Sequence, residues 1–209
     1  MKVATAVLLS LAGLISGCSL RAAGVSDAAL VESLPPPTLS MSLIGRYGLA
    51  HACPVDGLVV TAAHVAIGTT HDSLEIARGY VYQQGERQGH AGGYAPLVSR
   101  DLAQLLLDGD TAPRMARRAS SAPAIGDEVV WQQYNLTDHP MRIEVKRGKI
   151  TELAAGHVAF EPAPQAGASG GCLFDSTGDV VGVIVWTIGF SINESGVAAL
   201  LAGAWWPGS

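Results

Sequence analysis

The feature that most limits the fold of this chain is the regular spacing of turn residues between short apolar runs from Leu43 onward. Runs of about five to eight residues, many of them rich in Val and Ile, alternate with turns of Gly, Asp and Pro. Strands of this length with turn residues between them predict an all-β barrel or sandwich. The predicted strands are 57–62, 79–83, 128–134, 141–145, 157–161 and 180–185.

Two segments depart from this pattern. Apolar residues at a convincing helical spacing occur only at 197–201, which predicts a short C-terminal helix. Residues 110–124, which include Pro113 and Pro123, predict a connection between two groups of strands. This connection would divide the domain into barrels of roughly 43–110 and 120–195.

Composition excludes several other classes of protein. Of the 209 residues, 48% are hydrophobic and 15% are charged, which excludes a polar disordered chain. The formal net charge is −5 and no Lys/Arg cluster is present, so the chain has no basic surface to neutralise phosphates. We therefore do not expect nucleic acid as a partner. The length suits one domain or two small halves around a shared core.

Residues 1–17 have the pattern of a secretion signal. Lys2 precedes an apolar run that is too short to span a bilayer comfortably as a permanent helix. The run ends in Leu14-Ile15-Ser16-Gly17-Cys18, which resembles the lipobox of bacterial lipoproteins, where the cysteine is lipidated and becomes the new N-terminus. The resemblance implies an extracytoplasmic lipoprotein anchored through Cys18. Because Ser19 follows, it implies the outer membrane if the host is Gram-negative. An ordinary secretory signal with a chance cysteine is the alternative.

Residues 18–42 predict a tether between this anchor and a folded domain at 43–209. The segment contains Pro35-Pro36-Pro37 and shows little strand or helix periodicity. It could hold the domain away from a membrane surface. A disordered tail of no consequence is the alternative.

The segment Gly167-Ala168-Ser169-Gly170-Gly171 is the first with a chemical implication. A serine between glycines can lie on a sharp turn, with its hydroxyl exposed and backbone N–H groups aimed at one point. The pattern also matches the nucleophile elbow of α/β-hydrolases, in which the histidine follows the serine. All six histidines of this chain precede Ser169, so that interpretation lacks a base.

The remaining order is His, then Asp, then Ser. Two further segments fit it, Thr61-Ala62-Ala63-His64 and Asp101-Leu102-Ala103-Gln104-Leu105. Together with Gly167-Ala168-Ser169-Gly170-Gly171-Cys172-Leu173 they resemble the three motifs of trypsin-like serine proteases, from about residue 43 to about residue 203. The resemblance implies two six-stranded antiparallel β-barrels packed together.

The same resemblance implies a role for each site residue. His64 would be the general base, Asp101 its orienting acid and Ser169 the nucleophile of a serine endopeptidase that cleaves polypeptides without a cofactor or metal. The N–H groups of Gly167 and Ser169 would form the oxyanion hole. The other five histidines are expected to be structural or exposed: His51, His71, His90, His139 and His157.

Substrate preference follows from the resemblance only in outline. The base of the pocket for the substrate side chain would lie near Ala163, with walls from Val185, Trp186 and Thr187. No acidic residue occupies Ala163, which disfavours Arg or Lys and favours a small or apolar side chain.

Ala168 stands where digestive members of the family carry an Asp that pairs with a newly cut N-terminus. That route of activation is therefore not expected.

The chain has three cysteines, an odd number for a secreted protein. Lipidation of Cys18 would leave Cys53 and Cys172, which by the resemblance both lie near the seam of the two barrels. We hypothesise that they form a disulfide across the seam. Two buried thiols are the alternative.

Two other functions share the predicted fold. A catalytically silent trypsin-like fold could act as a binding or assembly lipoprotein. An esterase could use the same triad on another substrate.

Overall fold

The computed structural model describes residues 38–41, 50–67, 81–84, 87–97, 101–108, 113–135, 137, 142–165, 167–185 and 195–201. The predicted signal peptide and lipidation site at Cys18 lie outside these residues. The described part of the chain is mostly β-structure and holds a single short helix, α2 (Ala63–Ile67). No helix among the described residues is long and apolar enough to cross a membrane.

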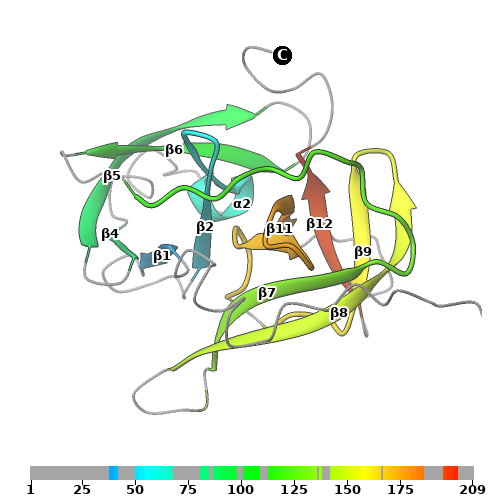
Figure 1. Cartoon of the computed structure of the whole chain (residues 1–209). Helices are drawn as coiled ribbons and strands as arrows, with labels where there is room; N and C mark the ends of the chain where they lie inside the picture. Colours follow the sequence, from blue (N-terminus) through cyan, green and yellow to red (C-terminus); the bar gives the residue numbers. More distant parts are fainter. Residues whose placement is uncertain are drawn as a thin grey trace, which may run out of the picture.

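The first six strands form one closed sheet. Their order is β1-β2-β3-β6-β5-β4, and β1 closes the ring because it pairs with both β2 and β4. Figure 1 shows this barrel on the left. The strands are β1 (Thr38–Met41), β2 (Ala50–Val55), β3 (Leu58–Ala62), β4 (Val81–Gln84), β5 (Arg87–Leu97) and β6 (Leu102–Asp108).

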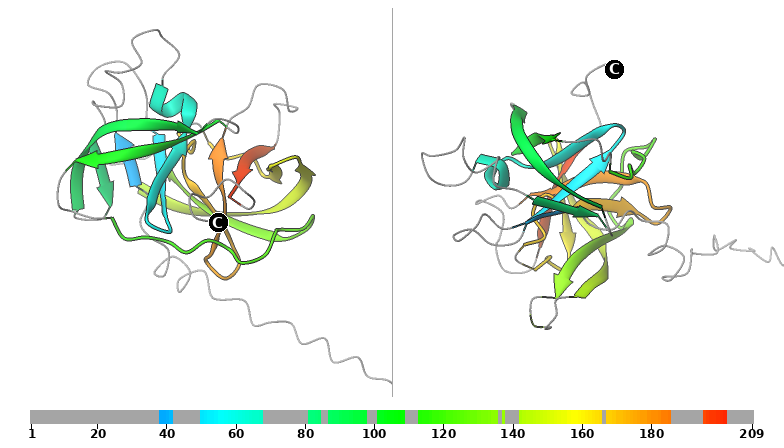
Figure 2. Two further views of the ribbon diagram at one scale, coloured as in Figure 1. Left: turned by 90° about the horizontal axis from the view of Figure 1, so that it is seen from above. Right: turned by 90° about the vertical axis from the view of Figure 1, so that its left-hand side faces the viewer.

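The second six strands form another closed sheet, on the right of Figure 1 and beside the first in the left view of Figure 2. Their order is β10-β11-β12-β9-β8-β7, and the ring closes through the pairing of β7 with β10. The strands are β7 (Glu128–Asn135), β8 (Arg142–Ala154), β9 (His157–Glu161), β10 (Cys172–Asp175), β11 (Val180–Val185) and β12 (Gly196–Leu200).

Each predicted strand coincides with an observed one, but several boundaries differ. The strand predicted at 141–145 extends as β8 to Ala154, far beyond its Val-rich start. The register of β8 against β9 shifts between Ile150 and Glu152, which marks a β-bulge. Charged residues such as Lys146 and Lys149 hid this length, because an apolar-run criterion stops at them.

The predicted C-terminal helix at 197–201 is wrong. These residues belong largely to β12, which pairs with β11 and β9. The run Val197-Ala198-Ala199-Leu200 is buried on both faces except at Leu200, so it carries no strand alternation. A short apolar run of this kind has no periodicity that separates a buried strand from a helix.

The first barrel begins earlier than predicted. β1 lies within 18–42, the segment assigned to the tether, and pairs with β2 at Leu39 and His51. A strand of four residues after Pro35-Pro36-Pro37 is too short to give a pattern of its own. The barrel therefore includes residues on the N-terminal side of position 43.

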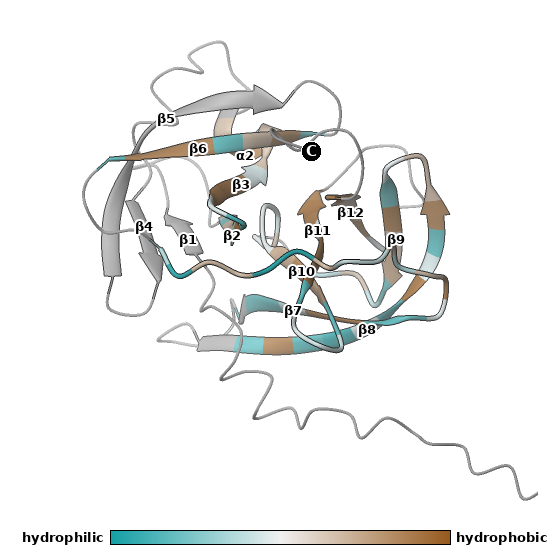
Figure 3. Ribbon diagram, turned by 45° about the horizontal axis from the view of Figure 1, so that its top comes forward, coloured by the Kyte–Doolittle hydropathy of each residue, from teal (hydrophilic) through white to brown (hydrophobic). Residues whose placement is uncertain are grey.

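Three apolar clusters fill the molecule. One lies within the first barrel and includes Val59 and Leu105, and another lies within the second barrel. In the second, the rings of Trp131 and Phe160 meet edge to face, with centroids 5.0 Å apart. The hydrophobic residues of β6, β9 and β11 are brown in Figure 3.

The third apolar cluster spans the two barrels. It contains Val60 and Cys53 from the first barrel and Val130, Cys172 and Val183 from the second. We call this contact zone the seam. Burial of side chains from both barrels in one cluster holds the two barrels together through the hydrophobic effect.

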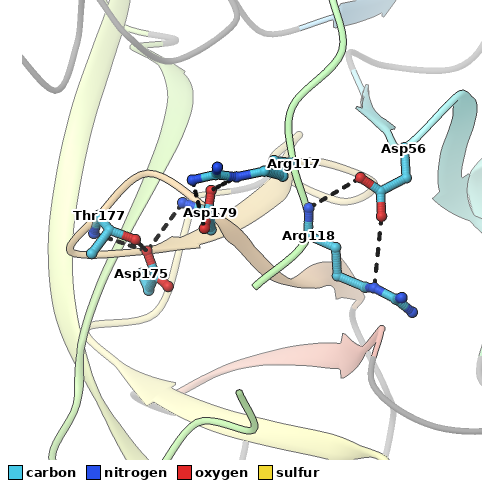
Figure 4. Close-up of polar contacts among 6 residues, drawn as sticks. All are labelled: Asp56, Arg117, Arg118, Asp175, Thr177 and Asp179. Carbon is cyan, nitrogen blue, oxygen red and sulfur yellow. Dashed lines mark hydrogen bonds and ion pairs between the residues drawn. The ribbon is translucent and has the colours of Figure 1, made fainter. Parts of the chain in front are cut away.

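The segment 113–124, which is the described part of the connection predicted at 110–124, lies between β6 and β7 and contacts both barrels. Ala116 bridges to Val55, and Arg118 bridges to Val180. Figure 4 shows its two arginines beside acidic partners on opposite sides. The Arg117 guanidinium donates to both carboxylate oxygens of Asp179, at 2.9 and 3.1 Å. The Arg118 amide donates to Asp56 Oδ1 at 3.2 Å.

A disulfide crosses the seam. It joins Cys53 of β2 to Cys172 of β10, with Cα atoms 4.8 Å apart and a sequence separation of 119. The predicted pairing of these two cysteines is confirmed. The bond closes a long loop that contains most of the first barrel.

We expect the double variant Cys53→Ala/Cys172→Ala to unfold at a lower denaturant concentration than the oxidised protein. Closing a loop this long stabilises a fold by on the order of 4 kcal/mol, mainly through the unfolded chain. Equilibrium unfolding in urea would measure the loss. The reduced wild-type protein is the control and should unfold near the variant. Equal midpoints for the oxidised protein and the variant would contradict the structural role of the bond.

Candidate active site

His64 and Asp101 are brought together by strand pairing. His64 lies in α2, directly after β3, and Asp101 directly precedes β6. β3 and β6 are antiparallel neighbours, with Ala62 opposite Leu102. The end of one strand and the start of the other therefore lie side by side, although His64 and Asp101 are 37 residues apart in sequence.

The two side chains are in direct contact. His64 Nδ1 lies 2.6 Å from Asp101 Oδ2, and the His64 amide donates to Asp101 Oδ1 at 3.0 Å. An ionised carboxylate can only accept hydrogen bonds, so Nδ1 carries the proton in this contact. The neutral imidazole then has its lone pair on Nε2, which is the protonation state that a general base requires.

Asp101 has an unusual backbone conformation. Its φ is 52°, in the left-handed region that residues other than glycine rarely adopt. Its carbonyl accepts a hydrogen bond from the Ala63 amide at 2.7 Å. Backbone and side chain together thus make three contacts to the start of α2, and these offset the cost of the conformation.

Ser169 lies in the second barrel, in the segment 167–171 before β10, which we call the serine loop. Gly167 and Gly170 have φ values of 91° and 85°. The Ala168 amide donates to Gln165 O at 3.1 Å and the Gly171 amide to Ala168 O at 3.0 Å. Ser169 is half-buried. The loop is thus a pair of tight turns with the serine at its centre.

The amides of Gly167 and Ser169 differ from those of Ala168, Gly170 and Gly171, which all donate to backbone carbonyls. In the part of the chain that the structure describes, neither N–H donates to a protein acceptor. The Ala168 side chain between them is buried in the apolar cluster of the second barrel. The position thus holds a packed methyl group.

His51 contacts the serine loop from the first barrel, a role that its sequence context did not indicate. It lies in β2 and is 1% exposed. Its amide donates to Ser169 O at 2.8 Å, and its Nδ1 lies 2.5 Å from Gly167 O. The Thr61 hydroxyl donates to His51 O at 2.7 Å. The only sequence signal is a polar residue inside the apolar run from Leu49 to Val55.

Burial of His51 lowers the pKa of its imidazole to about 4, against a smaller opposing effect of the Gly167 carbonyl. The ring is therefore neutral at neutral pH. A carbonyl oxygen only accepts, so Nδ1 holds the proton and donates to Gly167 O.

Gln133, in β7 of the second barrel, binds the chain just before the serine loop. Its side-chain oxygen accepts hydrogen bonds from the Gln165 amide at 3.1 Å and from Trp131 Nε1 at 3.0 Å. Its Nε2 donates to Glu144 at 2.9 Å, and this hydrogen bond is the main reason that the pKa of the Glu144 carboxyl is lowered. Nothing in the sequence singled out Gln133.

The residues expected around the substrate pocket are only partly described. Ala163 is half-buried and follows β9 after a cis peptide bond between Glu161 and Pro162. Val185 ends β11 and is buried in the seam cluster. Trp186 and Thr187 lie outside the described residues. No group of three or more metal-binding side chains occurs among the described residues.

The chain is similar to known peptidases in both sequence and fold. A family model described as a trypsin-like peptidase domain matches residues 51–183. The human pathogenic astrovirus serine protease superposes with a TM-score of 0.59 at 16% identity, over 82% of this chain and 91% of its own. The active form of the Rv3671c protease from M. tuberculosis superposes with a TM-score of 0.61 at 20% identity, over 82% and 79%. At these identities both structures show a shared fold. No curated protein matches the sequence significantly.

We expect Gly170→Ala to destabilise the protein more than Gly57→Ala. Both glycines have positive φ, 85° and 86°, so alanine strains the backbone equally at each. A Cβ on Gly170 would also collide with the His51 carbonyl and the Thr61 hydroxyl, whereas one on Gly57 would meet no described atom within 4 Å. We expect losses of about 2–4 kcal/mol for Gly170→Ala and about 1 kcal/mol for Gly57→Ala, measured by urea unfolding. Equal losses would contradict the close approach of β2 to the serine loop.

Proposed function

The chain belongs to the family of trypsin-like peptidase domains, and from this premise we propose that it is a serine endopeptidase. The observation that carries the proposal is the contact of His64 Nδ1 with the Asp101 carboxylate. Ser169, in a glycine-bounded turn of the second barrel, supplies the nucleophile. Peptide bonds of polypeptides are the substrates, and an acyl-enzyme is the intermediate.

The proposed reaction begins with attack of Ser169 Oγ on the carbonyl carbon of the peptide bond. His64 Nε2 accepts the hydroxyl proton and later donates it to the leaving amine. Water then attacks the ester carbon, His64 takes a proton from it, and Ser169 leaves with that proton restored. Asp101 holds the ring by its Nδ1–H and stabilises the imidazolium that forms in both halves.

The amides of Gly167 and Ser169 bind the oxyanion in this proposal. Both stand in the serine loop and donate to no described protein acceptor. A tetrahedral intermediate would place its negative oxygen between them, and removal of one such donor costs about 3 kcal/mol of transition-state stabilisation. The mechanism needs neither a metal nor a cofactor.

The proposed pocket accepts a small or apolar side chain. Ala163 at its base carries no charge to pair with Arg or Lys. Val185, Trp186 and Thr187 supply the walls. An apolar pocket gains affinity by removing the substrate side chain from water.

We also propose that the protein acts outside the cytoplasm, anchored to a membrane through lipidated Cys18. The support is the pattern of residues 1–18 together with the disulfide between Cys53 and Cys172. Structural disulfides persist chiefly in oxidising compartments. The tether after Cys18 would give the peptidase domain reach from the membrane surface.

A catalytically silent trypsin-like fold is the alternative. Loss of catalysis would remove the need for a histidine and a carboxylate in hydrogen-bond contact beside a strained Asp101 backbone. Their retention in this geometry favours the enzyme.

We expect a fluorophosphonate probe to label the wild-type protein and not Ser169→Ala. The probe reacts with an activated serine, so His64→Ala should lower the labelling rate by about 10³-fold or more. Ser176→Ala is the matched control, since Ser176 is exposed in the turn after β10, and it should be labelled like the wild type. Labelling would be followed by gel fluorescence and located by peptide mass mapping.

Folded wild-type protein that takes up no probe would favour the silent fold. Probe on a residue other than Ser169 would contradict the proposed nucleophile.

A further inference from the structure

We propose that His51 is a positioning residue for the oxyanion hole, an inference that rests on the proposed peptidase function. His51 forms hydrogen bonds to two carbonyls of the serine loop: its amide donates to Ser169 O and its imidazole to Gly167 O. Gly167 and Ser169 are also the residues whose N–H groups form the proposed oxyanion hole. It touches neither substrate nor the reacting atoms, and it acts through the loop.

The serine loop needs an external restraint because of its composition. Gly167 has a φ of 91°, and glycine populates many backbone conformations at little cost. The Gly167 N–H lies in the peptide unit before the Gly167–Ala168 unit and the Ser169 N–H in the one after it, so a change in the backbone torsions on either side of the Gly167–Ala168 unit would change the relative directions of the two donors. Such a loop keeps one conformation only if hydrogen bonds hold its peptide planes.

Those hydrogen bonds hold two peptide planes at both ends. In the plane between Gly167 and Ala168, His51 Nδ1 binds the carbonyl oxygen at 2.5 Å and Gln165 O binds the amide at 3.1 Å. In the plane between Ser169 and Gly170, the His51 amide binds the carbonyl at 2.8 Å and Ile184 O binds the amide at 2.7 Å. His51, a residue of the first barrel, is therefore the hydrogen-bond partner of the carbonyl in each of these two planes.

The plane between them is held within the loop. Ala168 O accepts from the Gly171 amide at 3.0 Å, and the opposite end of this plane is the Ser169 N–H. The Ser169 donor thus points away from Gly171. With its two neighbours fixed by His51, this plane has no freedom to turn.

His51 is itself held firmly. It is 1% exposed, and its carbonyl accepts the Thr61 hydroxyl at 2.7 Å. Cys53, two residues along β2, is bonded to Cys172, three residues beyond Ser169. The restraint on the loop is therefore part of the rigid seam, and the donors take their places only when the two barrels are assembled.

The test compares three substitutions of His51 in the full chain. His51→Leu fills the site but removes the donor to Gly167 O, and His51→Ala removes the ring. Both keep the backbone amide that binds Ser169 O. His51→Asn replaces the Nδ1–H with a side-chain amide donor at a similar distance from the backbone. Val59→Ala, a buried truncation in the first-barrel cluster, is the control for loss of stability alone.

We expect kcat on a peptide substrate to fall about 10²-fold or more in His51→Leu and His51→Ala, with KM changed less than about 3-fold, because the missing interaction acts in the transition state. The rate of fluorophosphonate labelling should fall in parallel. His51→Asn should restore at least about a tenth of the wild-type kcat, and Val59→Ala should keep wild-type kcat. If His51→Leu does not fold, His51→Ala gives the same comparison.

Three results would overturn the proposal: wild-type kcat in both His51→Leu and His51→Ala, a change in KM alone, or no rescue by His51→Asn. A crystal structure of His51→Ala tests the restraint without activity, and we expect its Gly167 carbonyl to leave the wild-type direction. An unchanged carbonyl would overturn the positioning role. Absence of labelling and turnover in the wild type would instead contradict the peptidase function.

Discussion

The junction between two barrels is the constraint on which the proposed site depends. His64 and Asp101 belong to the first barrel, and Ser169 with the amides of the proposed oxyanion hole belongs to the second, so neither barrel holds the complete proposed site. A peptidase of this kind requires its groups within hydrogen-bond reach of one substrate atom. The apolar seam cluster, the disulfide and the hydrogen bonds of His51 all act at this junction.

The disulfide and the hydrogen bonds of His51 both join β2 to the chain around the serine loop, but they restrain it in different ways. The disulfide from Cys53 to Cys172 limits how far β2 and β10 can separate, but its rotatable bonds leave the neighbouring loop free to turn. Hydrogen bonds are directional, so those of His51 determine which way the carbonyls of the serine loop point. The apolar contact supplies most of the free energy, and the polar contacts specify a single arrangement.

The sequence predicts this fold and site where the signal is local. The contact of His64 with Asp101 was predicted from the resemblance of two short motifs, and the disulfide from the cysteine count together with the same resemblance. The strand β12 was missed because a buried strand has no alternation, and β8 because its charged residues interrupt the apolar run. His51 and Gln133 could not be found from the sequence. The His51 side chain donates to the Gly167 carbonyl at a separation of 116 residues, and the Gln133 side chain accepts from the Gln165 amide at a separation of 32. Such pairings exist only once strands far apart in the chain are adjacent.

The most direct test of the central claim is a crystal structure of the protein with a peptide aldehyde or boronic acid bound. The account predicts a covalent bond from Ser169 Oγ to the inhibitor. It places the inhibitor oxygen about 2.7–3.1 Å from the amide nitrogens of both Gly167 and Ser169, with His64 Nε2 on the side of the leaving group. An adduct on another side chain, or an inhibitor oxygen turned away from both amides, would contradict it.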